Sequence, residues 1–243
     1  MEGSTETTGS GVGTLDRAVA VLDAVEAGAR TSTQVARATG LSGTTAHRLV
    51  KALEDHGFLA FYCAFGYRLG PRLLRLAAEA ARELPLRDVA HPELERLARV
   101  TGESAQLFVR SGDERVCIDA VESANELRTI VPVGSSLPLY AGSAAKVFLA
   151  FDPRPARHVR KAADPERFAR DVELVRSRGW ASSAGERQPG VGSVSAPVLG
   201  AYDILLAVVS VSGPAARMGR VGARRCAPAV LEAARGIERA LGR

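Results

Sequence analysis

The chain has 243 residues, with 32 Lys or Arg against 27 Asp or Glu, and its formal net charge at pH 7 is +5. This length accommodates one small and one medium-sized domain, and the small net charge excludes a polybasic arm as the basis of function. The three cysteines, Cys63, Cys117 and Cys226, lie far apart, which argues against a disulfide framework or a zinc site and suits a reducing cytoplasm.

The N-terminal segment 1–13 is rich in Ser, Thr and Gly, and we expect it to be disordered. No segment resembles a signal peptide, and no apolar run is long enough to span a membrane. We therefore expect a cytoplasmic protein that has no membrane partner. After this segment, Leu15, Val19 and Leu22 recur at helical spacing and predict the apolar face of a first helix.

Residues 31–55 predict two short helices that are joined by a tight turn. The hydroxyl side chains at 31–33 can cap the first helix, and Gly40 is a typical helix stop because glycine takes positive φ without penalty. Ser42 can then cap the second helix. Apolar residues at i, i+3, i+4 and i+7 predict the buried face of this second helix. They are Ala46, Leu49, Val50 and Leu53.

The opposite face of the second helix carries hydroxyl and basic side chains, and no acid occurs in this helix before Glu54. An acid at this surface would be repelled by phosphate groups, so this polarity is typical of a recognition helix in the major groove of DNA. The alternative is an ordinary helical hairpin with a solvated basic face. The residues on this face are Thr44, Thr45, Arg48 and Lys51, with His47 near its edge.

Two short strands are predicted at residues 57–62 and 67–69, around a loop that contains Gly66. Three helices followed by such a hairpin form a winged helix-turn-helix, which favours DNA binding over the solvated hairpin. We expect this wing to bring Tyr62, Phe65 and Arg68 close to the sugar-phosphate backbone or the minor groove.

A linker helix is predicted at residues 71–86, because Pro71 suits the first position of a helix and Pro85 is expected to end it. Residues 87–243 then alternate between helical and strand patterns. Helices that bracket an antiparallel sheet indicate an α+β domain. The helices are expected at 88–100, 144–151, 165–178 and 217–241, and the strands at 106–109, 116–120, 127–133, 192–198 and 204–212.

The serines of the C-terminal domain indicate a ligand pocket. Ser210 and Ser212 alternate with valines along one predicted strand, and Ser193 and Ser195 do so on another, so each pair faces one side of the sheet. Each buried hydroxyl needs a hydrogen-bond partner. A polar ligand is one candidate partner, and backbone groups or buried water are the alternative. The free N–H groups at the start of the helix after Gly142 form an anion site that suits a carboxylate.

Several short motifs occur in one order along nearly the whole chain. In the N-terminal part they are TLDRA (14–18), GLS (40–42), TAHRL (45–49) and YRLG (67–70). In the C-terminal part they are PVG (132–134), LPLYA (137–141), SAAK (143–146), RGW (178–180), GVGSVSAPV (190–198) and VSVSGP (209–214). Each motif alone is weak, but the ordered set resembles the isocitrate lyase regulator (IclR) family of bacterial transcription factors.

The resemblance implies a winged helix-turn-helix at 14–70 and, after the linker helix, an effector-binding and oligomerisation domain at 87–243 that is similar to GAF small-molecule sensors. It also implies a homodimer or tetramer on a roughly palindromic operator in double-stranded DNA, and a small-molecule effector for which a carboxylate is a candidate. Together with the patterns above, it implies DNA contacts by Arg17, Ser42, Thr44, Thr45, His47, Arg48, Lys51, Tyr62 and Arg68. The effector contacts that it implies are Glu126, Thr129, Ser143, Ala144, Ser183, Ser193, Ser210 and Ser212.

The chain departs from the family pattern at positions that bear on function. Gly43 stands where the family often has a basic residue, so Arg48 and Lys51 are expected to carry more of the phosphate contact. Members that bind small acids commonly have an acid at the position of Ser183 and a cysteine or other small residue at that of Ser193. These replacements leave the identity of the effector open.

We predict a sequence-specific transcriptional regulator, such as a repressor, whose operator binding is modulated by a metabolite. A DNA-bound platform without a small-molecule ligand is the alternative. A hydrolase or transferase is disfavoured, because the chain has no G-x-S-x-G, P-loop or H-E-x-x-H motif and its four histidines are predicted away from the serines. The spacing of Cys and His residues gives no reason to expect a metal or another cofactor.

Overall fold

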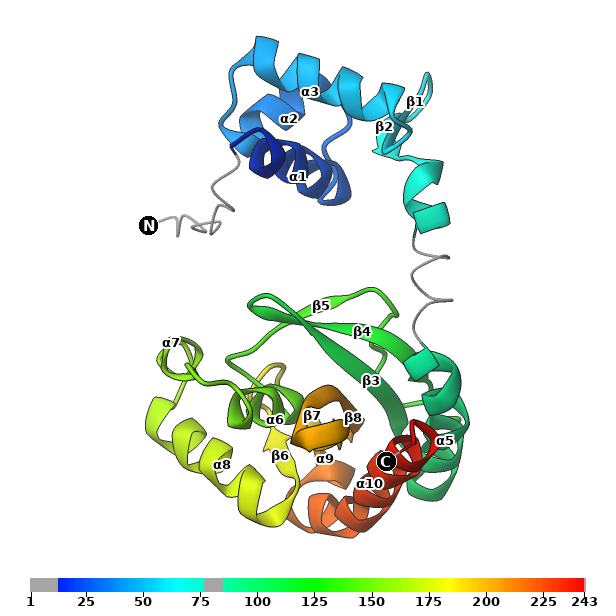
Figure 1. Cartoon of the computed structure of the whole chain (residues 1–243), viewed down its shortest axis with the longest axis vertical. Helices are drawn as coiled ribbons and strands as arrows, with labels where there is room; N and C mark the ends of the chain where they lie inside the picture. Colours follow the sequence, from blue (N-terminus) through cyan, green and yellow to red (C-terminus); the bar gives the residue numbers. More distant parts are fainter. Residues whose placement is uncertain (1–12, 77–84, 243) are drawn as a thin grey trace. The chain divides into compact units, whose positions relative to one another are not determined.

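The computed structural model describes residues 13–76 and 85–242, and the chain divides between residues 83 and 84 into two compact units (Figure 1). The segment 1–13, which we predict to be disordered, lies outside the described residues except for Gly13, the first residue of helix α1 (Gly13–Glu26). No helix within the described ranges is both long and apolar enough to cross a membrane.

The N-terminal unit contains three helices and a two-stranded antiparallel hairpin. The hydroxyl of Thr31 accepts a hydrogen bond from the N–H of Gln34, the hydroxyl of Ser42 accepts one from Thr45, and Gly40 ends the second helix at φ 69°. These local signals set the helix boundaries and confirm the predicted winged helix-turn-helix. The elements are α1, α2 (Ser32–Thr39), α3 (Gly43–Asp55), β1 (Leu59–Tyr62) and β2 (Gly66–Leu69).

The buried face of α3 agrees with the prediction, whereas that of α1 does not. In α3 the predicted stripe is buried around Val50. In α1 the side chains of Val21 and Val25 enter the core of the unit, while those of Leu15 and Val19 are 56% and 46% exposed. Two apolar stripes lie side by side on α1, and helical periodicity does not distinguish which of them meets the core.

The wing docks on the turn between α1 and α2 through a backbone contact. The N–H of Tyr67 donates to the carbonyl oxygen of Arg30 at 2.8 Å. The preceding residue, Gly66, has φ 69°, and a Cβ atom at this position would collide with the same carbonyl oxygen. This position therefore requires glycine for both conformational and steric reasons.

Gly66→Ala should destabilise the docked wing by about 1–3 kcal/mol, because alanine is disfavoured at positive φ and its Cβ displaces Arg30. Amide hydrogen exchange on the full chain should show faster exchange across β1 and β2. Gly43→Ala is the matched control, because Gly43 has open space at its Cβ position and alanine favours a helix. Equal protection of the wing in Gly66→Ala and the wild type would contradict the docking requirement.

The described residues of the predicted linker helix are helical from 71 to 76, and residues 77–84 lie outside the described part of the chain. Pro85 does not end a helix but begins α5 (Pro85–Thr101). Proline suits the first turn of a helix, because the N–H group that it lacks has no partner there in any residue.

The C-terminal unit is built on a six-stranded antiparallel sheet with the strand order β5-β4-β3-β8-β7-β6. The strand predicted at 127–133 is wrong: this segment is a loop, in which Pro132 has no N–H for a ladder and Gly134 turns the chain at φ 90°. The short strands β5 and β6 were not predicted. The strands are β3 (Ser104–Ser111), β4 (Glu114–Val121), β5 (Ser136–Pro138), β6 (Ala181–Ala184), β7 (Val191–Leu199) and β8 (Leu205–Pro214).

Helices cover both faces of this sheet, which confirms the predicted α+β class (Figure 1). Helices α5 and α10 (Arg220–Ala240) pack on one face, and α6 (Ser143–Ala150), backed by α8 (Pro165–Arg178), packs on the other. The helix predicted at 217–241 is interrupted, because the extended backbone of Gly219 separates α9 (Ala215–Met218) from α10. Two short helices complete the unit, α7 (Ala156–Val159) and η1 (Ala201–Asp203).

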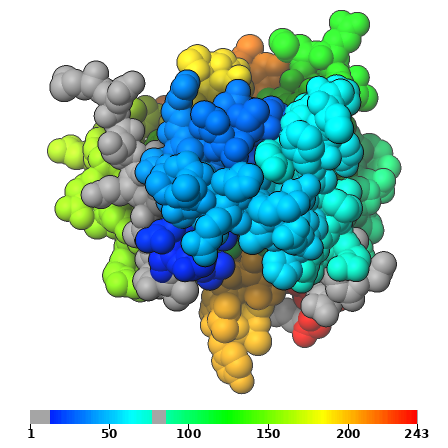
Figure 2. Space-filling view, turned by 90° about the horizontal axis from the view of Figure 1, so that it is seen from above, coloured from blue at the N-terminus to red at the C-terminus, as the bar shows by residue number. Residues whose placement is uncertain are grey.

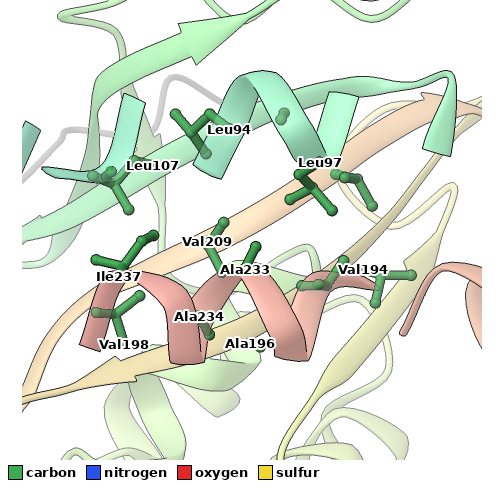
Figure 3. Close-up of a cluster of buried hydrophobic side chains, with 14 of the residues drawn as sticks. Leu94, Leu97, Leu107, Val194, Ala196, Val198, Val209, Ala233, Ala234 and Ile237 are labelled. Atoms are coloured by element: carbon green, nitrogen blue, oxygen red, sulfur yellow. The ribbon is translucent and has the colours of Figure 1, made fainter. Parts of the chain in front are cut away.

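The main core of this unit lies between the sheet and the pair α5 and α10 (Figure 3). Leu94 and Leu97 of α5 meet Ala233 and Ile237 of α10 above the strand valines, of which Val209 is one, and these side chains have no contact with solvent. Because side chains alternate along a strand, β7 and β8 turn their serines toward the other face, beside α6. The predicted division between a valine face and a serine face is confirmed.

Candidate functional site

On the surface of the N-terminal unit, α3 and the wing lie next to each other (Figure 2). A groove of about 600 Å³ lies between α1 and α3. Of the residues predicted to contact DNA, it brings together Arg17, Thr45, His47, Arg48 and Lys51. The others, Ser42, Thr44, Tyr62 and Arg68, are exposed outside the groove. The unit therefore has a continuous polar and basic surface on the predicted recognition helix.

The two basic side chains of α3 differ in their availability. The Nζ atom of Lys51 lies 3.1 Å from a carboxylate oxygen of Glu54 and 3.6 Å from one of Asp55. The hydrogen bond with Glu54 and the two negative charges raise the pKa of Lys51. Arg48 is exposed and has no ion-pair partner among the residues that the structure describes. Exposed pairs are weak, so Lys51 can exchange its partners for a phosphate, but Arg48 is the more accessible cation.

Ser42 and the wing contribute in different ways. The hydroxyl of Ser42 accepts from the N–H of Thr45 at 3.3 Å and donates to its hydroxyl oxygen at 2.8 Å, so it is committed to the turn. On the wing, the Cζ atom of Arg68 lies 5.9 Å from the ring centroid of Phe65. Tyr62 is half exposed. The wing thus presents aromatic and basic groups together.

A small cavity lies on the serine face of the C-terminal sheet, at the start of α6. Its volume is about 30 Å³, which is room for about two water molecules. The predicted effector residues that line it are Ser143, Ala144, Ser183, Ser193, Ser210 and Ser212. Glu126 and Thr129 are not brought to it: both lie in the loop between β4 and β5, where Glu126 is exposed and Thr129 is buried.

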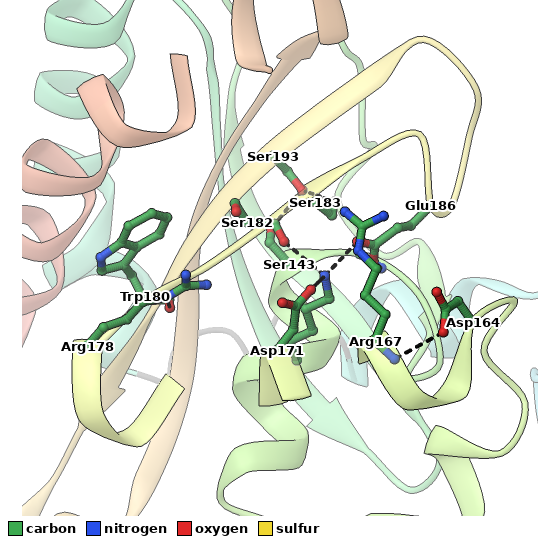
Figure 4. Close-up of polar contacts among 12 residues, drawn as sticks. Ser143, Asp164, Arg167, Asp171, Arg178, Trp180, Ser182, Ser183, Glu186 and Ser193 are labelled. Carbon is green, nitrogen blue, oxygen red and sulfur yellow. Dashed lines mark hydrogen bonds and ion pairs between the residues drawn. The ribbon is translucent and has the colours of Figure 1, made fainter. Parts of the chain in front are cut away.

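The serine hydroxyls around the cavity bond to one another (Figure 4). The Oγ atom of Ser143 lies 2.6 Å from that of Ser193 and 2.7 Å from that of Ser195. Ser195 in turn donates to Ser210 at 2.8 Å, and Ser183 lies 2.9 Å from Ser193.

Ser210 also donates to the carbonyl oxygen of Val194 at 3.2 Å, and Ser212 donates to Gln106 Oε1 at 3.1 Å. A backbone group is thus one partner, as the alternative hypothesis has it, but most partners are side chains of the protein, which neither hypothesis included. These hydroxyls need no ligand to satisfy their hydrogen bonds.

One of the N–H groups that the sequence predicts to be free for an anion at the start of α6 is already bonded to a side chain of the protein. The N–H of Gly142 donates to Glu186 Oε2 at 3.2 Å, and Glu186 Oε1 lies 2.5 Å from Lys146 Nζ. Lys146 is buried and also pairs with Asp171 at 2.7 Å, beside Glu186 (Figure 4). Glu186 belongs to the loop between β6 and β7, so the start of α6 and the charge of Lys146 hold this loop in place.

Two basic residues of the cavity were missed at the sequence level, Arg115 of β4 and Arg187 of the β6–β7 loop. Arg115 is 3% exposed; its Nη1 donates to the carbonyl oxygen of Pro138, and its Nε has no hydrogen-bond partner in the described part of the chain. Burial, and then the charge of Arg187, lower the pKa of Arg115 to about 9, so it is still a cation at pH 7.

A signal for Arg115 exists in the sequence. The buried positions of β4 are 115, 117 and 119, so a basic residue occupies the inward side of an alternating strand. Arg187 offers no comparable signal, because it lies in a loop between two glycines. The remaining wall of the cavity is partly apolar and was not predicted either. It includes Phe108, Val131, Leu137 and Val191.

Comparisons with known proteins agree with this arrangement. Residues 14–61 match the IclR helix-turn-helix domain, and residues 78–239 match the bacterial transcriptional regulator IclR C-terminal domain. The glycerol operon regulatory protein of Streptomyces coelicolor is 30% identical over 243 residues, which cover 94% of this chain and 96% of that protein.

Solved structures extend the similarity to the fold of the whole chain. An IclR transcriptional regulator from Alicyclobacillus acidocaldarius has a TM-score of 0.80 at 27% identity, covering 95% of this chain and 99% of that one. An IclR homolog from Microbacterium hydrocarbonoxydans, complexed with 4-hydroxybenzoate, has a TM-score of 0.79 at 26% identity, and the match covers 94% of this chain and 98% of that one. This chain therefore belongs to the IclR family, whose members are DNA-binding transcriptional regulators and not enzymes.

Proposed function

We propose that the chain binds a roughly palindromic operator as a dimer or a dimer of dimers, and that a small-molecule effector in its C-terminal cavity modulates this binding. The observation that carries the proposal is the presence, in one chain, of an exposed basic recognition face and of a separate cavity lined by polar and cationic groups. Because the target is chromosomal DNA, we expect the protein to act in the cytoplasm.

In the proposed complex α3 enters the major groove. Arg48 and Lys51 contact phosphates or a guanine edge, and His47 reads a base. Thr44 and Thr45 contact phosphates and thymine methyl groups. All of these side chains but Thr45, which is partly buried, are exposed on one helix face, and this supports these roles.

The groove and the wing supply the remaining DNA contacts of the proposal. Arg17 reaches the backbone from α1, because it lines the same groove as the basic residues of α3. Tyr62 and Arg68 of the wing contact the sugar-phosphate backbone or the minor groove. Ser42 acts by fixing the start of α3, since its hydroxyl is already bonded within the turn.

The exposed apolar stripe of α1 supports a dimer that forms through the N-terminal units. Leu15 and Val19 are about half exposed on the first helix of the DNA-binding unit, and contact with a second copy would bury them. Two recognition helices related by two-fold symmetry would then meet successive major grooves, about one helical turn apart.

The homologue that is complexed with 4-hydroxybenzoate supports a ligand in the C-terminal unit. A ligand of that size needs a pocket of roughly 300 Å³ or more, so the cavity of about 30 Å³ must widen before a ligand enters. The loop 185–190 is suited to this movement, because Gly185 and Gly190 flank it with φ 72° and 78°. Opening it breaks the contacts of Glu186, which couples the ligand to a change of conformation.

The proposed effector contacts are the serines that line the cavity, together with Ala144. Glu126 and Thr129 become contacts only if the loop between β4 and β5 also moves toward the ligand. The effector acts on DNA binding through its different affinities for two arrangements of the protein.

One observation favours the alternative, a platform regulator that has no ligand. The serine hydroxyls are already satisfied, and the cavity is nearly closed. In that case the serine network is a polar part of the core, and the protein acts through its DNA contacts or a protein partner.

Genomic DNA fragments that the full chain retains should identify the operator, whose affinity is then measured by fluorescence anisotropy. Between 50 and 200 mM salt we expect the affinity to fall by roughly 10³-fold or more, because bound phosphates release counterions. At fixed salt, metabolites that are linked to the neighbouring genes should shift the binding curve. A flat salt dependence would contradict phosphate anchoring, and no response to any metabolite would favour the platform.

A further inference from the structure

The guanidinium of Arg115 is a buried cation without an acidic partner. Its side chain lies over the ring of Phe108, with 5.7 Å between Cζ and the ring centroid, and one nitrogen donates to the carbonyl oxygen of Pro138. Within the described residues no carboxylate pairs with it, and Nε is unbonded. A buried ion is costly unless it is paired, so this position is prepared for an anion that the protein itself does not supply.

The charges around the cavity reinforce this imbalance. Its described lining includes two arginines, Arg115 and Arg187, and no acid. The nearest acid along the loop, Glu186, is directed to Lys146 and the N–H of Gly142 instead. The positive charge of Arg187 acts on Arg115 without compensation. The other polar side chains of the lining are serine hydroxyls and the amides of Gln106 and Gln188, which accept or donate without adding charge.

We propose that Arg115 binds one anionic group of the effector at the base of the cavity and that Arg187 binds a second at its mouth, so that the effector is a small dianionic acid. This inference rests on the proposed function, because it requires a ligand in the cavity. An arginine binds a carboxylate through two parallel hydrogen bonds. The site therefore selects its ligand by geometry as well as by charge. The apolar residues that line the same cavity, such as Val131 and Leu137, suit a short hydrocarbon chain that joins the two acid groups.

The charge balance separates this effector class from a monoanion such as 4-hydroxybenzoate. A monoanion would neutralise only one of the two arginines and would leave one positive charge in the cavity uncompensated. A dianion neutralises both, and it removes the repulsion between them. The preference for two acid groups is therefore assigned to the arginines and not to the serine network.

The test uses isothermal titration calorimetry on the full chain, with pairs of acids of equal carbon number. The dianions are succinate, glutarate and adipate, and the monoanions are butyrate, valerate and hexanoate. We expect at least one dianion to bind at least tenfold more tightly than its monoanion partner. Arg115→Met should weaken that binding at least tenfold, and Arg187→Ala should reduce the preference for the dianion to below threefold. Arg99 is an exposed arginine of α5, so Arg99→Ala is the matched control, and this variant should bind the acids as the wild type does.

A second readout distinguishes a ligand contact from a structural brace. Without ligand, thermal unfolding followed by the fluorescence of Trp180, the one tryptophan of the chain, should show Arg115→Met to be at least as stable as the wild type. A marked loss of stability would assign Arg115 to holding Pro138 and would overturn the inference. It would also be overturned if no dianion binds, if both acid classes bind equally, or if Arg115→Met binds normally.

Failure of this inference and failure of the proposed function give different results. If a neutral compound or a monoanion alters operator binding equally in the wild type and in Arg115→Met, the proposed function stands and the dianion inference fails. If dianions bind in calorimetry but no compound alters operator binding, the inference about the site stands and effector control fails.

Discussion

Arg48→Ala should weaken operator binding by about 1–3 kcal/mol, roughly 5- to 150-fold at fixed salt. Arg48 is the exposed cation of α3 that has no ion-pair partner among the described residues, so its whole charge is available to a phosphate or a guanine edge. Lys51 should have a smaller effect, because it must first leave Glu54 and Asp55. Fluorescence anisotropy titrations with a labelled operator measure the loss of affinity in the variants of both residues.

Two control variants make this result specific. Arg48→Lys keeps the positive charge but loses the planar guanidinium group. A partial loss of operator affinity in this variant would indicate that Arg48 contacts a base, and near-normal affinity would indicate a phosphate contact. Arg99→Ala removes the same charge from an exposed position on α5 and should leave operator affinity unchanged. Operator binding by Arg48→Ala that equals the wild type would remove Arg48 from the interface.

Leu97→Ala should lower the free energy of unfolding of the C-terminal unit by about 2–5 kcal/mol. Leu97 is fully buried between α5, α10 and the sheet, and its neighbours are held by two helices and several strands, so they cannot collapse into the space that it leaves. This is the largest effect on stability that we expect from a single truncation in the main core.

Denaturant unfolding followed by Trp180 fluorescence measures this change, because Trp180 packs against the same core and reports only on the C-terminal unit. Val100→Ala is the matched control on the same helix. The side chain of Val100 is 63% exposed, so its truncation should change the stability by less than about 0.5 kcal/mol. Similar losses in the two variants would mean that α5 does not pack as described.

The parts of the fold that depend on local chemistry were predictable from the sequence. A hydroxyl at position 42 and a glycine at position 40 determine how α2 ends and α3 begins, and both act within one turn of the chain. The buried face of α1 was not predictable, because Leu15 and Val19 form an apolar stripe as regular as that of Val21 and Val25. Only packing against the other helices decides between them.

In the cavity, too, local patterns predict some features and leave others unpredicted. Alternation along β7 and β8 predicts which side chains share a face, and the serines do line the cavity. The neighbours across that face come from distant segments: Ser143 meets Ser193, and Glu186 reaches the start of α6. No local rule predicts such contacts. Arg115 was missed because an arginine is rarely buried, and its burial depends on the whole strand order.

The bonded serines have a consequence for what this wall can offer to a neighbouring group. Each hydroxyl has one proton, and Ser210 donates its own to the carbonyl oxygen of Val194. The donors therefore run in one direction, from Ser183 through Ser193, Ser143 and Ser195 to Ser210. A chain that ends on a backbone carbonyl has no spare proton, so it offers lone pairs and not donors. Only a substitution within the chain itself would reverse that polarity.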